Sequence, residues 1–405
     1  MNDANAKTGS LATMLLCFLV TVLEGYDLQI ISSAGPHLKR EMGLTPDQTG
    51  IFFSATLIGL AIGSILGGSI ADRIGRKPAL IWSVAALGAF TLLTSIATNF
   101  ETILTLRILA GIGLGGAMPT LIALIAEVSG GRRTTSAVTT IIVGQPTGGI
   151  ISALVGRTIA ETYGWQSLFL VGGMLTVITI PLLMKQLPET KAASAHQLEA
   201  AKANRMPTGE ALFGQGRAVP TLLLWAIFIL TLALLSILLS WTPLLVMGKG
   251  FERAIGLNAI IAINAGGIVG GVVISRMIDR FGVRWPMIGL YVLMTVGIYF
   301  FAQATAFGPL MGFAFLTGFA VLGAQFTLYG VTPQLYPKIG RGSAVGVAVA
   351  MGRIGSILGP IVVGGLLAAG SHEIEVLYRM VPVALVAGVA LFVMTMTAKI
   401  GMDDD

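Results

Sequence analysis

The stretch "GGSIADRIGRKP", which runs from Gly67 to Pro78, decides the fold of this chain. It closes a segment without charges and surrounds an Asp-Arg-X-Gly sequence with further basic residues. The stretch "ISRMIDRFGVRW", from Ile274 to Trp285, closes a second apolar segment and has the same Asp-Arg-X-Gly order. The two aspartates, Asp72 and Asp279, lie 207 residues apart. The sequence therefore predicts that one structural unit occurs twice.

The spacing of 207 residues recurs at three further places without a gap. It relates Ser136-Ala137-Val138 to Ser343-Ala344-Val345, Gly111 to Gly318, and Pro36 to Pro243. Two parallel repeats, related by an axis along the membrane normal, are typical of secondary transporters.

The composition indicates that lipid surrounds the chain. Of its 405 residues, 55% are hydrophobic and 11% are charged, whereas about 25% of the residues in soluble domains are charged. The single cysteine, Cys17, and the three histidines have no metal-ligand spacing. We also find no nucleophile–base constellation, so we expect no metal, no cofactor and no enzyme activity.

The apolar stretches predict an all-α membrane protein. A helix needs about 20 apolar residues to cross the hydrocarbon core. Twelve stretches qualify: 11–33, 50–71, 79–98, 102–125, 136–158, 165–184, 221–247, 256–278, 286–304, 309–331, 343–368 and 377–398. We expect two parallel six-helix pseudo-repeats, an N-terminal half at 1–184 and a C-terminal half at 220–405, joined by a polar cytoplasmic linker at 185–219.

The basic residues predict the orientation of these helices. With the N-terminus inside, 17 of the 25 Lys and Arg residues fall on the cytoplasmic side. The remaining eight are Lys39, Arg40, Arg157, Lys249, Arg253 and Arg379 on the opposite side, and Arg107 and Arg353 inside spans. Both termini are therefore expected in the cytoplasm. The bias also explains the net charge of +6 without nucleic acid.

Several of these motifs resemble one known family. "GGSIADRIGRK" and its second copy resemble the cytoplasmic loop signature of the major facilitator superfamily, and "RILAGIGLGGAMP" (Arg107–Pro119) resembles the fourth-helix motif of its proton-coupled members. "EGYD" followed by Pro36 is similar to the first helix of the aromatic acid:proton symporter family, although Glu24 stands where most members have Asp. "LEGYDLQ", "LSWTPLL" and "AVAMGRIGSILGP" are most similar to the branch that carries 3-(3-hydroxyphenyl)propionate.

This resemblance implies a transporter with the major facilitator fold. We expect it to import an aromatic carboxylate, such as 3-(3-hydroxyphenyl)propionate or a related phenolic or benzoic acid, by proton symport with alternating access. Its expected partners are the substrate, protons and the lipid bilayer of the cell inner membrane, and we expect a monomer. The alternatives are a proton-driven exporter, a symporter of another organic anion, and a membrane sensor that transports nothing.

Four charges inside the spans are specific to one repeat. The spacing of 207 residues pairs Glu24 with Thr231, Asp27 with Leu234, Arg107 with Ala314, and Arg353 with Pro146. A charge that only one repeat carries is not needed by the shared scaffold. We therefore assign these four residues to a functional site.

The two acids lie on one face of the first helix, at positions i and i+3. At 1.5 Å per residue, Asp27 and Arg107 fall at about the same depth, so we expect these two to pair. Glu24 is then our candidate for the residue that binds and releases the proton. The alternative is that both acids only pair with arginines and hold helices together.

Arg353 falls near the membrane midplane, where its planar guanidinium suits a substrate carboxylate. The alternative is an arginine that packs helices by bonding to carbonyl groups. Weaker candidates for binding a ring hydroxyl, each equally able to bridge helices, are Gln29, Gln145, Asn264 and Gln325, and Tyr329 is a candidate for stacking on a substrate ring. Trp241 is expected to anchor its helix at the outer interface.

The loop motif has a mechanical interpretation. In the family, this cluster is thought to latch the two halves on the cytoplasmic side. The residues expected in such a gate are Asp72, Arg73, Gly75, Arg76, Glu127 and Arg133. Positive-inside topology alone would explain the basic residues but not Asp72 or Gly75.

Overall fold

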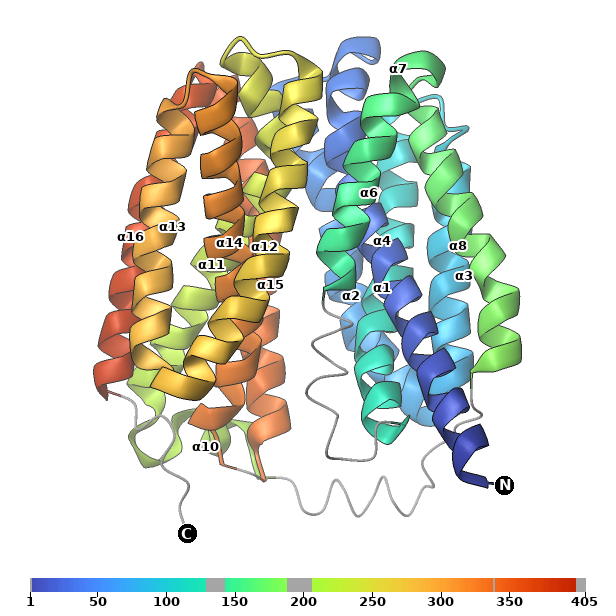
Figure 1. The fold of residues 1–405 in the computed structure, drawn as a ribbon, viewed down its shortest axis with the longest axis vertical. Helices are drawn as coiled ribbons and strands as arrows, with labels where there is room; N and C mark the ends of the chain where they lie inside the picture. The colour runs from blue at the N-terminus through green and yellow to red at the C-terminus, as the bar shows by residue number, and fades with distance from the viewer. Residues whose placement is uncertain (1, 129–142, 188–205, 338, 398–405) are drawn as a thin grey trace. The chain divides into compact units, whose positions relative to one another are not determined.

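The computed structural model describes residues 2–128, 143–187, 206–337 and 339–397 (Figure 1). Nearly all of these residues are helical, and no strand occurs in these ranges. The chain divides into two compact units, Met1–Ala195 and His196–Asp405. In each unit the long helices run side by side along a common direction (Figure 1).

The first unit contains α1 (Asn2–Glu41), α2 (Pro46–Ile74), α3 (Arg76–Thr94), α4 (Phe100–Val128), α6 (Gly144–Thr158), α7 (Ala160–Tyr163) and α8 (Gln166–Gln186). The second contains α10 (Thr208–Phe213), η1 (Gly214–Gly216), α11 (Ala218–Gly248), α12 (Arg253–Phe281), α13 (Arg284–Gln303), α14 (Phe307–Val331), η2 (Thr332–Leu335), α15 (Arg341–Ala368) and α16 (Glu373–Thr397).

Among the described residues, 11 helices are long and apolar enough to cross a membrane. They correspond to all of the expected spans except 136–158, which is described only from Gly144, as α6. Several helices are longer than the apolar stretches that predict them. The first helix, for example, continues to Glu41, beyond the end of its apolar stretch at Ser33. The backbone can remain helical after the apolar residues end.

The helices repeat with the spacing found in the sequence. Helix α12 begins and ends 207 residues after α2, and α14 begins 207 residues after α4. The packing partners repeat as well. Helix α2 packs most extensively on α4, and α12 packs most extensively on α14. Likewise, α1 packs on α6, and α11 packs on α15. The prediction of two structural repeats is therefore confirmed by both helix bounds and helix packing.

Local signals in the sequence explain where α2 begins and ends. Thr45 and Gln48 form a reciprocal capping box, with hydrogen bonds of 3.0 and 3.3 Å, and Pro46 occupies the first turn. The helix ends at Gly75, whose φ of 92° suits glycine. Gly282 ends α12 with φ of 74°, so the loop glycine has the same function in both units.

Helix crossings explain why glycines also repeat. A side chain at Gly318 would collide with the carbonyl oxygen of Ile263, and one at Gly111 with the carbonyl oxygen of Thr56. Thr56 and Ile263 are again 207 residues apart. The same backbone contact therefore occurs in both units, and each crossing admits only glycine.

The crossing predicts an effect of substitution at Gly318. We expect Gly318→Ala to destabilise the protein by about 1–3 kcal/mol, because the added methyl group must push α14 away from α12. Gly330→Ala is the matched control, since it lies in the same helix with no atom within 4 Å of an added Cβ. Thermal unfolding of the purified proteins in detergent measures both. Equal midpoints for the two variants would contradict the crossing geometry.

Candidate functional site

A buried ion pair joins two helices of the first unit. The Nη1 atom of Arg107 in α4 lies 3.1 Å from Oδ1 and 3.4 Å from Oδ2 of Asp27 in α1. The exposed fractions are 0% for Arg107 and 2% for Asp27. Because both charged groups are removed from water, the opposite charge of each partner must offset the desolvation cost of the other.

Two threonines of α3 complete the coordination of this pair. The hydroxyl of Thr91 donates to Oδ1 of Asp27 at 2.6 Å. Arg107 donates from Nη2 to Thr91 Oγ1 at 3.2 Å and to Thr94 Oγ1 at 2.9 Å, and from Nη2 to the carbonyl of Phe90 at 3.3 Å. Three helices, α1, α3 and α4, thus meet at one polar cluster.

Helix α8 adds an aromatic contact to the same cluster. The guanidinium carbon of Arg107 lies 4.9 Å from the ring centroid of Phe169. Such a cation–π contact stabilises a desolvated arginine. The arginine is therefore held on several sides and has little freedom to change its position.

Sequence reasoning missed Thr91, Thr94 and Phe169. Thr91 corresponds to Ile298 and Thr94 to Phe301 in the second repeat. Both positions are therefore polar in the first repeat and apolar in the second. The same asymmetry that identified Asp27 and Arg107 could have found them.

Glu24 lies one turn before Asp27 in α1 and is fully buried. The neighbouring Gly25 lets α1 approach the backbone of Gln145 in α6, where a Cβ would collide. On the other side, the hydroxyl of Tyr26 donates to the carbonyl of Leu168 in α8 at 2.9 Å. These contacts fix the rotation of α1 and hold both carboxyl groups inside the unit.

The two candidate glutamines of the first unit lie along the contact between α1 and α6. Gln29 is buried, and its amide group fills the space that a side chain at Gly149 would occupy. Gln145 is half-buried in the first turn of α6. The structure therefore places Gln29 and Gln145 at the contact between α1 and α6.

In the second unit, Arg353 is half-buried in α15. Its Nε atom is buried and has no hydrogen-bond partner among the described residues. The adjacent Gly352 packs against Phe228 of α11, whose ring centroid lies 5.7 Å from that of Tyr329 in α14. Two aromatic rings therefore lie at the helix position that precedes Arg353.

The other candidates of the second unit have different surroundings. Gln325 is half-buried one turn before Tyr329 on the same face of α14. Asn264 is fully buried in α12, and its amide donates to the carbonyl of Ile260 at 2.9 Å.

Trp241 is not the interface anchor that the sequence predicts: it is buried, and its Nε1 donates to the carbonyl of Pro360 at 3.2 Å. The prediction for this residue is therefore wrong. The hydrogen-bond partner of the indole nitrogen lies in α15, and the sequence alone does not reveal this contact.

The expected gate is only partly described. Gly75 ends α2, Arg73 is exposed in the last turn of that helix, and Arg76 is half-buried in the first turn of α3. Arg133 lies outside the described residues, as do the side chains of Asp72 and Glu127.

A comparison with known families identifies the family of this chain. The model of the Major Facilitator Superfamily matches residues 17–274 and 254–401. The chain belongs to the major facilitator superfamily. The predicted all-α fold of two six-helix repeats is the fold of this family, and the protein is a multi-pass membrane transporter rather than an enzyme.

Several members of the superfamily are similar over nearly the whole chain. The 3-(3-hydroxy-phenyl)propionate transporter of Escherichia coli (strain K12) is 35% identical, over 96% of this chain and 95% of the relative. The 4-hydroxybenzoate transporter PcaK of Pseudomonas aeruginosa is 30% identical, over 93% and 91%. A crystal structure of a D-xylose-proton symporter has the same fold, with a TM-score of 0.75, 19% identity and 95% and 97% coverage.

The buried ion pair predicts a large effect on stability. We expect Asp27→Asn to destabilise this transporter by about 3–5 kcal/mol, because it leaves Arg107 charged and uncompensated in the interior. Glu375→Gln, which removes an exposed partner of Arg379 at 3.9 Å, should cost at most about 1 kcal/mol. Thermal unfolding in detergent compares the two variants. Similar losses would mean that the buried pair has no special importance for the fold.

Proposed function

We propose that this protein imports an aromatic carboxylate together with protons by alternating access. The observation that carries the proposal is Arg353, a cation inside a membrane helix whose Nε is buried and lacks a hydrogen-bond partner among the described residues. Even a half-buried cation inside a membrane span is costly unless an anion compensates it. A substrate carboxylate would supply that anion.

The surroundings of Arg353 favour an aromatic acid over other anions. A guanidinium binds a carboxylate with two parallel hydrogen bonds. Phe228 packs against Gly352, the neighbour of Arg353 in the chain, and its ring lies 5.7 Å from that of Tyr329, so these two rings would offer faces for an aromatic substrate. Gln325 is near enough along α14 to bond a ring hydroxyl, and Gln29, Gln145 and Asn264 are further candidates for polar contacts. The relatives named as transporters of hydroxyphenylpropionate, hydroxybenzoate and gentisate support the same substrate class.

The two acids of α1 would serve different purposes in proton coupling. Asp27 is engaged by Arg107 and Thr91, so protonating it would break both interactions. We therefore assign the transported proton to Glu24, which is fully buried one turn away. A carboxyl group at such a position is more readily neutralised than left charged.

The proton would also supply the driving force. One proton moving with one monoanion transfers no net charge, so only the pH gradient would drive that transport. A second proton would add about 2.3 kcal/mol per 100 mV of membrane potential. A pH gradient with the acidic side outside would therefore drive import until the opposing substrate gradient balances it.

The remaining assignments follow from charge and family. We propose a monomer in the cell inner membrane, with both termini and the linker at 185–219 in the cytoplasm. The halves would rock about a central site. A cytoplasmic gate formed by Asp72, Arg73, Gly75, Arg76, Glu127 and Arg133 would latch them on the inner side.

The competing function is export of an organic anion by proton exchange. Uptake into proteoliposomes distinguishes the two, because symport accumulates labelled 3-(3-hydroxyphenyl)propionate when the outside is acidic and loses this accumulation with an uncoupler. An exporter would accumulate it only when the inside is acidic.

Arg353 predicts how substrate affinity responds to mutation. We expect Arg353→Lys to weaken binding of the best acid on the order of 30-fold to several thousand-fold, equivalent to about 2–5 kcal/mol, although the charge is kept. A lysine offers a point charge in place of a planar fork. Competition against labelled acid measures the affinity.

The control for this prediction uses the amide of the same acid. Removing the carboxylate should cost wild-type protein far more affinity than it costs Arg353→Ala, since both changes delete one contact. Equal losses in the two proteins would show that Arg353 and the carboxylate do not interact.

A further inference from the structure

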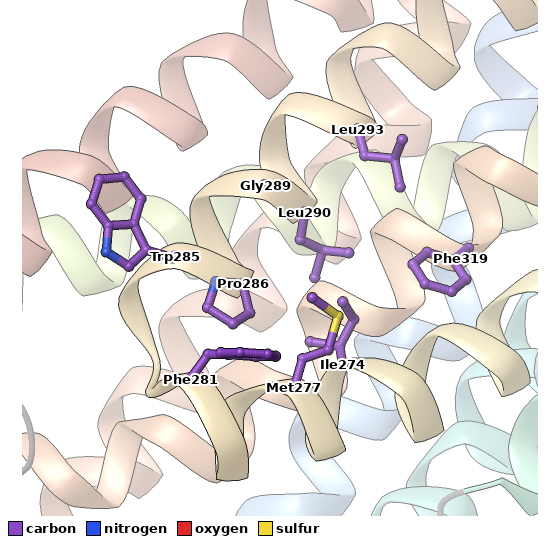
Figure 2. A pocket seen from close by; sticks show the side chains of 9 residues that line it. All are labelled: Ile274, Met277, Phe281, Trp285, Pro286, Gly289, Leu290, Leu293 and Phe319. Carbon is purple, nitrogen blue, oxygen red and sulfur yellow. The ribbon is translucent and has the colours of Figure 1, made fainter.

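A groove without polar side chains opens at one end of the second unit, where α12 turns into α13. It has a volume of about 450 Å³. Its lining consists of Ile274, Met277, Phe281, Trp285, Pro286, Gly289, Leu290, Leu293 and Phe319. Figure 2 shows Phe281 beneath Pro286, with Met277, Ile274 and Leu290 beside them. Phe281 and Trp285 are 59% and 67% exposed, so the groove is open on this side.

Arginines stand directly over the exposed rings of this groove. The guanidinium carbon of Arg280 lies 5.3 Å from the ring centroid of Phe281, and that of Arg284 lies 5.4 Å from the ring of Trp285. Arg276 is exposed one turn before Arg280. No carboxylate of the described residues lies within ion-pair distance of these three arginines.

One of these cations is also incompletely bonded. The Nε atom of Arg284 is buried and has no hydrogen-bond partner among the described residues, although another nitrogen of the same group contacts Met396. The charge excess at the groove is therefore positive.

This arrangement is specific to the second repeat. The positions that correspond to Phe281 and Trp285 in the first unit are Ile74 and Pro78. The shared scaffold therefore does not need the stacked aromatic and arginine pairs. The basic residues at this end place it on the cytoplasmic side of the membrane.

We propose that this groove binds an anionic phospholipid of the cytoplasmic leaflet, with an acyl chain between α12, α13 and α14 and its phosphate on Arg280 and Arg284. The groove matches an acyl chain because its lining has no polar side chain. The rim matches a phosphodiester because arginine presents several donors to phosphate oxygens. Basic pockets between membrane helices on the cytoplasmic side suit such head groups.

The charge separates this occupant from other lipids. A zwitterionic lipid could fill the apolar part equally well but would bring no net charge to the arginines. A basic residue near the membrane surface contributes about 1 kcal/mol toward an anionic lipid, which is about fivefold in affinity. The preference for an anionic head group is therefore the property that tests the proposal.

The test uses the fluorescence of Trp285 in the full-length protein. The protein is placed in nanodiscs that contain brominated-acyl phosphatidylglycerol or, at equal mole fraction, brominated-acyl phosphatidylcholine. The difference from the Trp285→Phe variant isolates the signal of this tryptophan. We expect phosphatidylglycerol to be preferred by about fivefold or more, and Arg280→Gln/Arg284→Gln to abolish the preference. Arg379→Gln, an exposed arginine of α16, should leave it unchanged.

Three results would overturn the proposal. They are equal quenching by the two lipids, an unchanged preference in the double variant, and no quenching by either lipid, which would mean that protein, such as a second copy of the chain, covers the groove. Raising the salt to about 1 M, where the Debye length falls to about 3 Å, should weaken the preference in unmutated protein. An excess of inorganic phosphate should not remove the lipid preference. Loss of that preference would also overturn the proposal, because it would identify free phosphate as the ligand.

Discussion

The ion pair between Asp27 and Arg107 determines where α1, α3 and α4 meet, and much of the first unit depends on it. Because both groups are buried, neither can be removed alone without leaving a charge uncompensated. Thr91 and Thr94 satisfy the remaining donors and acceptors and thereby tie α3 to the pair. This network holds Glu24 at a fixed depth one turn away. A proton that binds at Glu24 would therefore act on a helix whose position is already set by charge.

The two repeats separate what the scaffold requires from what the site requires. The backbone contact of Gly148 with Val22 is repeated by Gly355 with Ile229, 207 residues later. Such crossings are shared because helix packing inside a membrane depends on small residues and close approach. The buried charges are not shared. A duplicated fold thus supplies a common framework, and in the function that we propose the differences between its halves supply the chemistry.

Most of the fold could be predicted from the sequence, because helix length, charge bias and internal repeats are strong signals in a membrane protein. The depth estimate also placed Asp27 and Arg107 at one level, and the structure brings them together. Rotation of helices about their own axes could not be predicted in this way, so the partners of Trp241 and the threonines around Arg107 were missed. Those partners depend on packing between segments far apart in the chain, such as Tyr26 with Leu168.

The assignment of the transported proton to Glu24 is the central claim about mechanism, and comparing net accumulation with exchange tests it most directly. Both are measured in proteoliposomes with labelled 3-(3-hydroxyphenyl)propionate, for wild-type protein and Glu24→Gln. The account predicts that Glu24→Gln exchanges labelled for unlabelled substrate but does not accumulate it under an inward proton gradient, because exchange requires no release of a proton. Accumulation by Glu24→Gln to the wild-type level would contradict it.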